Sequence, residues 1–177
     1  MTTNELLLTC RGLSGHSLKQ ILVNKEQKCF TACAVCPENE TMFLGMENGY
    51  ILIYEMTDSG LYRRLETRLY GHSARINQLF YNHKGRVLVS CDSEGNLFLW
   101  EKRQNTHNFS KMCSMHHWET AITSVYYLHD QKILFVACAN RTIQIFRQDL
   151  YKKFVEVQKM ENAHTLKITK LAYSSKL

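Results

Sequence analysis

Apolar residues along this chain form short runs that are separated by turn-forming residues. In the clearest stretch, from Gly71 to Trp100, the runs cover residues 76–81, 86–91 and 96–100. The segments between them, 82–85 and 92–95, contain the Asn, Asp, Ser and Gly residues that favour tight turns. This pattern predicts three antiparallel strands.

Within the runs the apolar residues are nearly continuous and do not alternate strictly with polar ones. Examples are residues 97–100 (LFLW) and 133–136 (ILFV). Strands of this kind are buried on both faces. We therefore expect each sheet to lie between two neighbouring layers.

The pattern recurs along the chain at a spacing of 46 residues. An aromatic residue ends the third run at Tyr54, Trp100 and Phe146, each 46 residues after the previous one. The same step links the heads of the first runs, at Phe30, Ile76, Ile122 and Ile168. Matches in several positions at one spacing indicate an internal structural repeat.

The spacing divides the chain into units. Residues 1–24 are predicted to be the end of a preceding unit, with strands at 5–9 and 17–23. Three full units are predicted at 25–70, 71–116 and 117–162, and the start of a further unit at 163–177. The chain holds 177/46, or about 3.8, such units.

A Gly-His pair at residues 71–72, four short strands per unit and a terminal Trp100 together resemble the WD-repeat β-propeller family. The resemblance implies an all-β fold, a partial β-propeller of four-stranded antiparallel blades. Because seven blades of this length would need roughly 320 residues, we expect the chain to be a fragment of a larger ring. If the chain is complete, we expect it to self-associate.

The resemblance also implies a hydrogen-bonded tetrad in the central unit. Blades of this family often join a His, a second-strand Ser or Thr, a turn Asp and the Trp. His72, Ser90 and Trp100 match these positions, and Glu94 stands where the turn Asp is expected. The first unit has Glu26, Leu44, Asn48 and Tyr54, and the third has Trp118, Val136, Asn140 and Phe146. Neither of these sets can form the network.

The composition is that of a folded soluble protein, with 45% apolar residues, 21% charged residues and one proline. No secretory signal follows Met1, and no apolar run is long enough to span a membrane. We predict a cytoplasmic location, with nuclear or endosome-associated locations as alternatives.

Three cysteines, Cys29, Cys33 and Cys36, have the spacing of an iron–sulfur motif and would support a metal-dependent enzyme. The repeat instead aligns Cys33 with Leu79 and Val125 in an inner strand, which predicts buried thiols.

The pair at residues 116–117, two histidines near Cys113, raises the alternative of a zinc site. A structural zinc site needs four ligands, and no second ligand pair lies nearby in the sequence. We therefore interpret the pair as part of a loop. We predict no catalytic residues, no metal and no cofactor.

The net charge of +6 offers a second class of function. Basic residues cluster at 63–64, 152–153 and 167–170, and could attract acidic membranes or, less favourably, nucleic acid. The order of Gly49, the segment 71–77 and a lone Trp resembles WD-repeat proteins that also carry a FYVE zinc finger, although the finger itself is absent from this sequence. A phosphoinositide or endosomal adaptor is thus the alternative function.

The preferred function is a non-catalytic protein–protein interaction scaffold, which the resemblance places on one face of the propeller. The loops and turns of that face contain Arg75, Ser93, Trp118 and Lys167, of which Trp and Arg are common interface anchors. Trp118 is the first choice, with a packed residue as its alternative role.

Overall fold

The structure is a computed structural model that describes residues 6–10, 19–23, 30–36, 41–56, 62–103, 108–116 and 118–174. All regular structure within these ranges is β-strand, in three four-stranded antiparallel sheets and one two-stranded sheet. The predicted all-β fold, a partial propeller, is confirmed. Within the same ranges no helix is long and apolar enough to cross a membrane.

The strands fall into four sheets along the chain. The two-stranded sheet holds β1 (Leu6–Cys10) and β2 (Lys19–Val23). The first four-stranded sheet holds β3 (Phe30–Cys36), β4 (Thr41–Met46), β5 (Ile51–Met56) and β6 (Tyr62–Leu69). The second holds β7 (Ile76–Asn82), β8 (Val87–Asp92), β9 (Leu97–Lys102) and β10 (Phe109–Met115). The third holds β11 (Ile122–Leu128), β12 (Ile133–Cys138), β13 (Ile143–Gln148) and β14 (Phe154–Met160).

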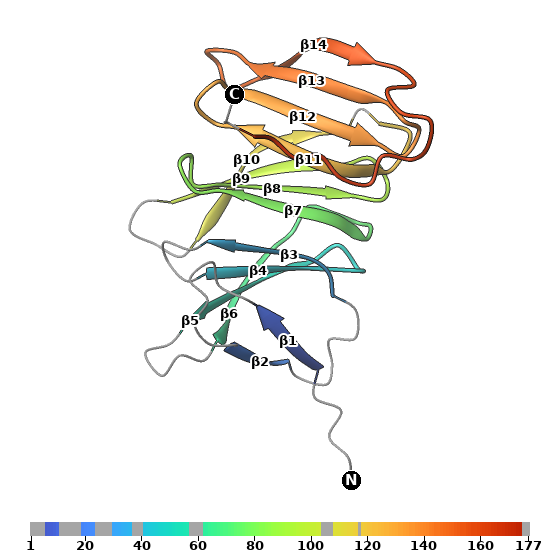
Figure 1. The fold of residues 1–177 in the computed structure, drawn as a ribbon. Coiled ribbons are helices and arrows are strands. Elements are labelled where there is room, and N and C mark those ends of the chain that lie inside the picture. Colours follow the sequence, from blue (N-terminus) through green and yellow to red (C-terminus); the bar gives the residue numbers. More distant parts are fainter. Residues whose placement is uncertain are drawn as a thin grey trace.

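Within each sheet the strands pair in sequence order, because short turns can join only antiparallel neighbours. The sheets then stack in the order of the chain, so that the two termini lie at opposite ends of the stack (Figure 1). This stacking is the open arc of a propeller.

The hydrophobic core lies between the sheets. One cluster joins the first and second sheets and includes Phe43 and Leu88, and another joins the second and third sheets. All six residues of β8 are buried, whereas Ile133 and Phe135 of β12 are only partly buried. The difference arises because β8 lies between two sheets, and no described sheet covers the far side of β12 (Figure 1).

Polar side chains link the inner strands of successive sheets. The amide of Asn82 on β7 donates to the backbone oxygen of Tyr127 on β11 at 3.0 Å. The backbone N–H of Val125 donates to Oε1 of Gln78 at 2.7 Å. These bonds hold the two inner strands side by side without a shared ladder.

The C-terminal stretch 163–174 follows the same arrangement. The N–H of Leu171 donates to Oγ of Ser124 at 2.8 Å. Both residues lie 46 positions after the pair Val125 and Gln78, so the same bond recurs in the next unit. No strand is assigned here, although a first strand was predicted. The physical reason is that the described residues offer this stretch no neighbouring strand with which to form a ladder.

Cys33 differs from the prediction of a buried thiol. Its side chain is exposed, while the equivalent residues Leu79 and Val125 are 5% and 0% exposed. Those two side chains face a complete preceding sheet, whereas β3 is preceded only by the two-stranded sheet. Cys36 is buried as predicted, and Cys29 lies outside the described residues.

Candidate functional site

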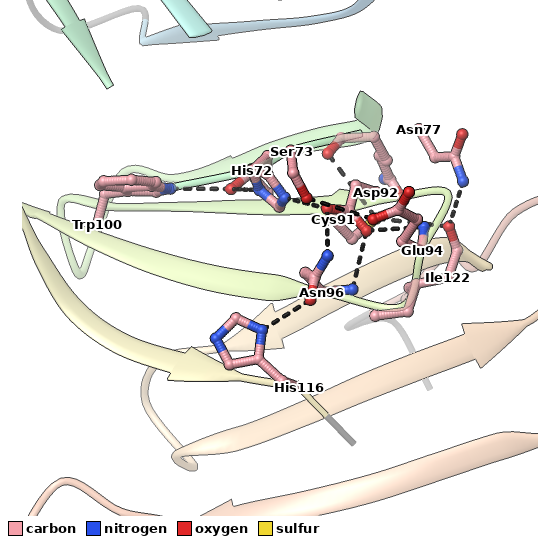
Figure 2. A network of polar contacts seen from close by, with 12 residues as sticks. His72, Ser73, Asn77, Cys91, Asp92, Glu94, Asn96, Trp100, His116 and Ile122 are labelled. Atoms are coloured by element: carbon pink, nitrogen blue, oxygen red, sulfur yellow. Dashed lines mark hydrogen bonds and ion pairs between the residues drawn. The ribbon is translucent and has the colours of Figure 1, made fainter. Parts of the chain in front are cut away.

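A buried chain of hydrogen bonds joins the loop before β7 to the strands β8 and β9 (Figure 2). Nδ1 of His72 lies 2.7 Å from Oδ2 of Asp92, and its Nε2 lies 2.7 Å from Oγ of Ser90. Nε1 of Trp100 donates to the same Oγ at 2.8 Å. All four residues are buried. The network therefore ties the loop to the sheet from inside.

The direction of each bond follows from the chemistry of the indole. The Trp100 N–H can only donate, so Oγ of Ser90 accepts from it. The Ser90 hydroxyl then donates its own proton to Nε2 of His72, which leaves the His72 proton on Nδ1, where it donates to Asp92. Only the neutral Nδ1–H tautomer of His72 satisfies every partner.

The Asp92 carboxylate also organises the turn that follows β8. Its Oδ1 accepts the backbone N–H groups of Glu94 and Asn96, both at 2.9 Å, and its Oδ2 accepts the Asn96 side-chain amide at 2.8 Å. Oδ1 of Asn96 lies 2.7 Å from Nδ1 of His116 (Figure 2). One carboxylate thus fixes both the loop and the turn.

The carboxylate of the network was assigned to Glu94 from the sequence, and this assignment is wrong. Glu94 is exposed at the tip of the turn, where its side chain accepts a bond from Ser73 at 3.3 Å. Residues two apart in a strand share a face, so Asp92 points inward beside Ser90. Glu94 lies beyond the strand and points outward.

The pKa values agree with a neutral histidine beside an ionised carboxylate. Burial lowers the pKa of His72 below its ordinary value, against the opposing effect of Asp92. Burial alone would raise the pKa of Asp92, but hydrogen bonds from His72 and Asn96 outweigh it and the pKa is lowered. Both shifts preserve the bond pattern at neutral pH.

The order Asp92, His72, Ser90 matches the residue types of a hydrolase triad. A nucleophile must reach a substrate, yet the Ser90 side chain is 0% exposed. Its lone pair already accepts from Trp100, and its proton is held by His72. In this arrangement the three groups stabilise the fold and have no access to a substrate.

The neighbouring sheets replace the network with apolar side chains. Leu44 and Val136 occupy the Ser90 position and are fully buried, and Tyr54 and Phe146 occupy the Trp100 position. Glu26, at the His72 position of the first unit, lies outside the described residues. Apolar packing therefore substitutes for the network in these sheets.

The loops that enter each inner strand and the turns between second and third strands lie at one edge of the stack, which we call the loop face. Its segments are residues 47–50, 71–75, 93–96, 118–121, 139–142 and 163–167. Backbone hydrogen bonds join neighbouring segments at 2.9–3.0 Å, from Ser93 to Arg75, from Ala139 to Ala121 and from Ala163 to Arg141. These bonds join the loop and turn of the second sheet to each other, and the loop and turn of the third sheet to each other and to residues 163–167.

Glycine allows these segments to meet. Gly95 has φ of +83°, and a Cβ there would lie 2.1 Å from the carbonyl oxygen of Trp118. Gly49 has the same φ and would meet the carbonyl oxygen of His72 at 2.5 Å. At the equivalent position of the third sheet, Arg141 takes φ of +70°.

Of the residues assigned to a partner-binding face, Arg75, Ser93 and Lys167 are exposed on the loop face. Trp118 is not a protruding anchor, because it is only 9% exposed. Its ring packs edge-on against Phe146 with centroids 5.6 Å apart, and its indole N–H donates to the Gln144 side chain. The alternative packed role of Trp118 is the one observed.

The two basic clusters whose side chains are described lie at opposite ends of β14. Residues 152–153 form the turn before β14, whereas Lys167 and Lys170 follow its other end. Side chains 63–64 and His117 lie outside the description. Within the described ranges, no group of three or more His, Cys, Asp or Glu residues is placed to hold a metal ion.

Comparisons with known proteins identify one repeat and the architecture. Residues 63–101 match the WD40 family model, described as "WD domain, G-beta repeat". No curated protein matches by sequence. The crystal structure of Saccharomyces cerevisiae Sqt1 aligns with 94% of this chain and 40% of that one, at 11% identity and a TM-score of 0.68. A chain of the crystal structure of the mitotic checkpoint complex aligns with 92% of this chain and 45% of that one, at 18% identity and a TM-score of 0.72. The chain thus spans less than half the length of either structural neighbour.

Proposed function

We propose that this chain, with its WD40 repeat at residues 63–101, is a non-catalytic protein-interaction scaffold that binds partner proteins on its loop face. The observation that carries the proposal is the set of hydrogen bonds that orders the loops of that face. Backbone bonds between segments and the buried His72 network hold the loops before any partner arrives. A surface that is already ordered loses less entropy on binding.

The exposed groups of the loop face suit a protein partner. Arg75 and Lys167 provide cations and Leu166, 72% exposed, provides an apolar contact. Arginine is enriched among residues that dominate interface energies. One structural neighbour comes from a crystal structure of the mitotic checkpoint complex, and this supports a role for the architecture in multi-protein assemblies.

Site-specific photo-crosslinking in cells tests the proposal. A photoreactive phenylalanine analogue replaces Arg75 on the loop face, and in a matched control it replaces Lys153, which is exposed at the opposite end of the sheet. We expect defined protein adducts from position 75 that are absent from position 153. The substitution Lys167→Glu should weaken these adducts, since it reverses a charge on the same face.

Two results would count against the scaffold. Equal adducts from both positions would indicate non-specific contact. Absence of protein adducts, together with binding to anionic phosphoinositide vesicles that is lost at about 0.5 M salt, would favour the membrane-adaptor alternative.

A further inference from the structure

The third sheet has a cavity of about 400 Å³ on the loop face, where the second sheet has its polar network. The cavity lies between the loop at 118–120 and the turn at 139–142, and its lining includes Cys138, Gln144 and Lys159. Its volume falls in the range of ligand-binding pockets. Neither the repeat pattern nor the family match assigns a role to it.

Three side chains around the cavity differ from those at the equivalent positions of the second sheet. In the second sheet Phe98 packs between His72 and His116, with ring centroids 4.4 and 5.3 Å away. Gln144 takes the place of Phe98 in the third sheet. Cys138 replaces Asp92 and Thr142 replaces Asn96, so shorter side chains replace those that close the space in the second sheet.

Two lining groups have unused hydrogen-bonding capacity. Thr142 is only 5% exposed, yet its hydroxyl makes no hydrogen bond to any described residue. The Glu119 carboxylate lines the cavity and forms no ion pair within the described ranges. The Thr142 hydroxyl and the exposed Glu119 carboxylate can both accept hydrogen bonds from a ligand.

The two charged side chains that line the cavity, Glu119 and Lys159, differ in their partners. The Lys159 ammonium lies 2.8 Å from Oε1 of Glu161, so its charge is already compensated. A further carboxylate, Glu156, accepts from the Gln144 amide at 2.6 Å. Arg141 is exposed on the adjoining turn but does not line the cavity. Of the two charged side chains that line the cavity, Lys159 is therefore paired, and the Glu119 carboxylate has no ion-pair partner among the described residues.

We propose that this cavity binds an arginine side chain of a partner protein that docks on the loop face, an inference that rests on the proposed function. A guanidinium is planar and carries five donors, which suits the Glu119 carboxylate and the Thr142 hydroxyl together. The Trp118 indole forms part of the wall and can stack on the guanidinium plane.

A blocked peptide, acetyl-Gly-Arg-Gly-amide, is the probe, and NMR of the 177-residue chain is the measurement. We expect saturable shifts of the Trp118 indole N–H and the Thr142 amide. The citrulline analogue, which has the same shape without the charge, should cause no shift at the same concentration. Glu119→Gln should weaken arginine-peptide binding by about two- to fivefold, in line with loss of an exposed charged partner.

The matched control is Glu94→Gln, which neutralises an exposed carboxylate on the same face that does not line the cavity, and which should leave the affinity unchanged. Absence of saturable shifts, equal binding of citrulline, or full affinity in Glu119→Gln would each overturn the inference. Position-75 adducts that persist while the peptide fails to bind would leave the scaffold proposal standing. If no such adducts form, the scaffold proposal fails and the peptide titration still decides on the cavity.

Discussion

The Ser90 hydroxyl joins two buried partners, so its removal tests the network most directly. In Ser90→Ala the Trp100 N–H loses its acceptor and Nε2 of His72 loses its donor, and both residues are at most 6% exposed. Each buried polar group left without a partner costs about 1–3 kcal/mol. We expect the free energy of unfolding to fall by about 3 kcal/mol.

A double-mutant cycle with Trp100→Phe separates the two bonds. Phenylalanine already occupies this position in the third sheet, as Phe146. Without the indole N–H, the Ser90→Ala substitution leaves only the His72 nitrogen unsatisfied. The serine substitution should therefore cost about 1–2 kcal/mol less in the Trp100→Phe background, a coupling within the range found for contacting residues.

Urea unfolding provides the assay, followed both by circular dichroism and by fluorescence of Trp118, which is present in all variants. Coincidence of the two transitions establishes that one free energy describes the unfolding. Ser93→Ala is the control, since this serine is exposed and its loss should cost less than about 0.5 kcal/mol. A cost for Ser90→Ala as small as that of the control, or strict additivity in the cycle, would refute the reasoning.

Three further predictions concern the pH dependence of stability, the substitution of Gly95, and self-association through the uncovered face of the third sheet. The pKa of His72 is lower in the folded state than its ordinary value of 6.5, so the unfolded chain binds protons first and stability should fall as the pH drops below about 6.5. The pKa of Asp92 is also lowered, so a second loss of stability should follow as the pH falls below its ordinary value of 3.8. Between about pH 7 and 5, the urea midpoint of His72→Gln should change less with pH than the urea midpoint of the wild type. Gly95→Ala should lower the free energy of unfolding by at least about 2 kcal/mol, because φ at this position is positive and the added Cβ would meet backbone oxygens. The control is Gly71→Ala, whose Cβ would have no neighbour closer than 3.2 Å. Thermal melts should show a much smaller loss of stability for this control. The partly buried face around Phe135 should make the purified chain self-associate; light scattering should give a lower mass for Phe135→Lys, and an unchanged mass would contradict this.

The sequence identifies three of the four network residues because they stand at fixed spacing from the turns and strand ends. His72, Ser90 and Trp100 are found in this way. The carboxylate is not, since the choice between Asp92 and Glu94 depends on where the strand ends and the turn begins. Asp92 and Glu94 are two residues apart, so the alternation of strand faces does not distinguish them. Asp92 is the last residue of the strand, whereas Glu94 lies at the tip of the turn.

The inner strands show a second feature that periodicity alone does not reveal. In all three four-stranded sheets the ladder shifts register one residue after the strand begins, at Thr31, Asn77 and Thr123. These positions are themselves 46 residues apart. Each is polar and follows an apolar strand head, which is the signal in the sequence that could have indicated a bulge.

By itself the sequence determines the period, the strands and the stacking of buried sheets, because apolar runs and turn residues act locally and repeat at one spacing. Only the tertiary structure decides which side chains meet across that stacking. Trp118 is packed because Phe146 and Gln144 lie beside it, and the cavity next to it arises from three smaller side chains on separate segments. Burial of the same repeat position differs between sheets, as at Cys33 and Leu79, since exposure depends on the neighbouring layer and not on the residue's own strand.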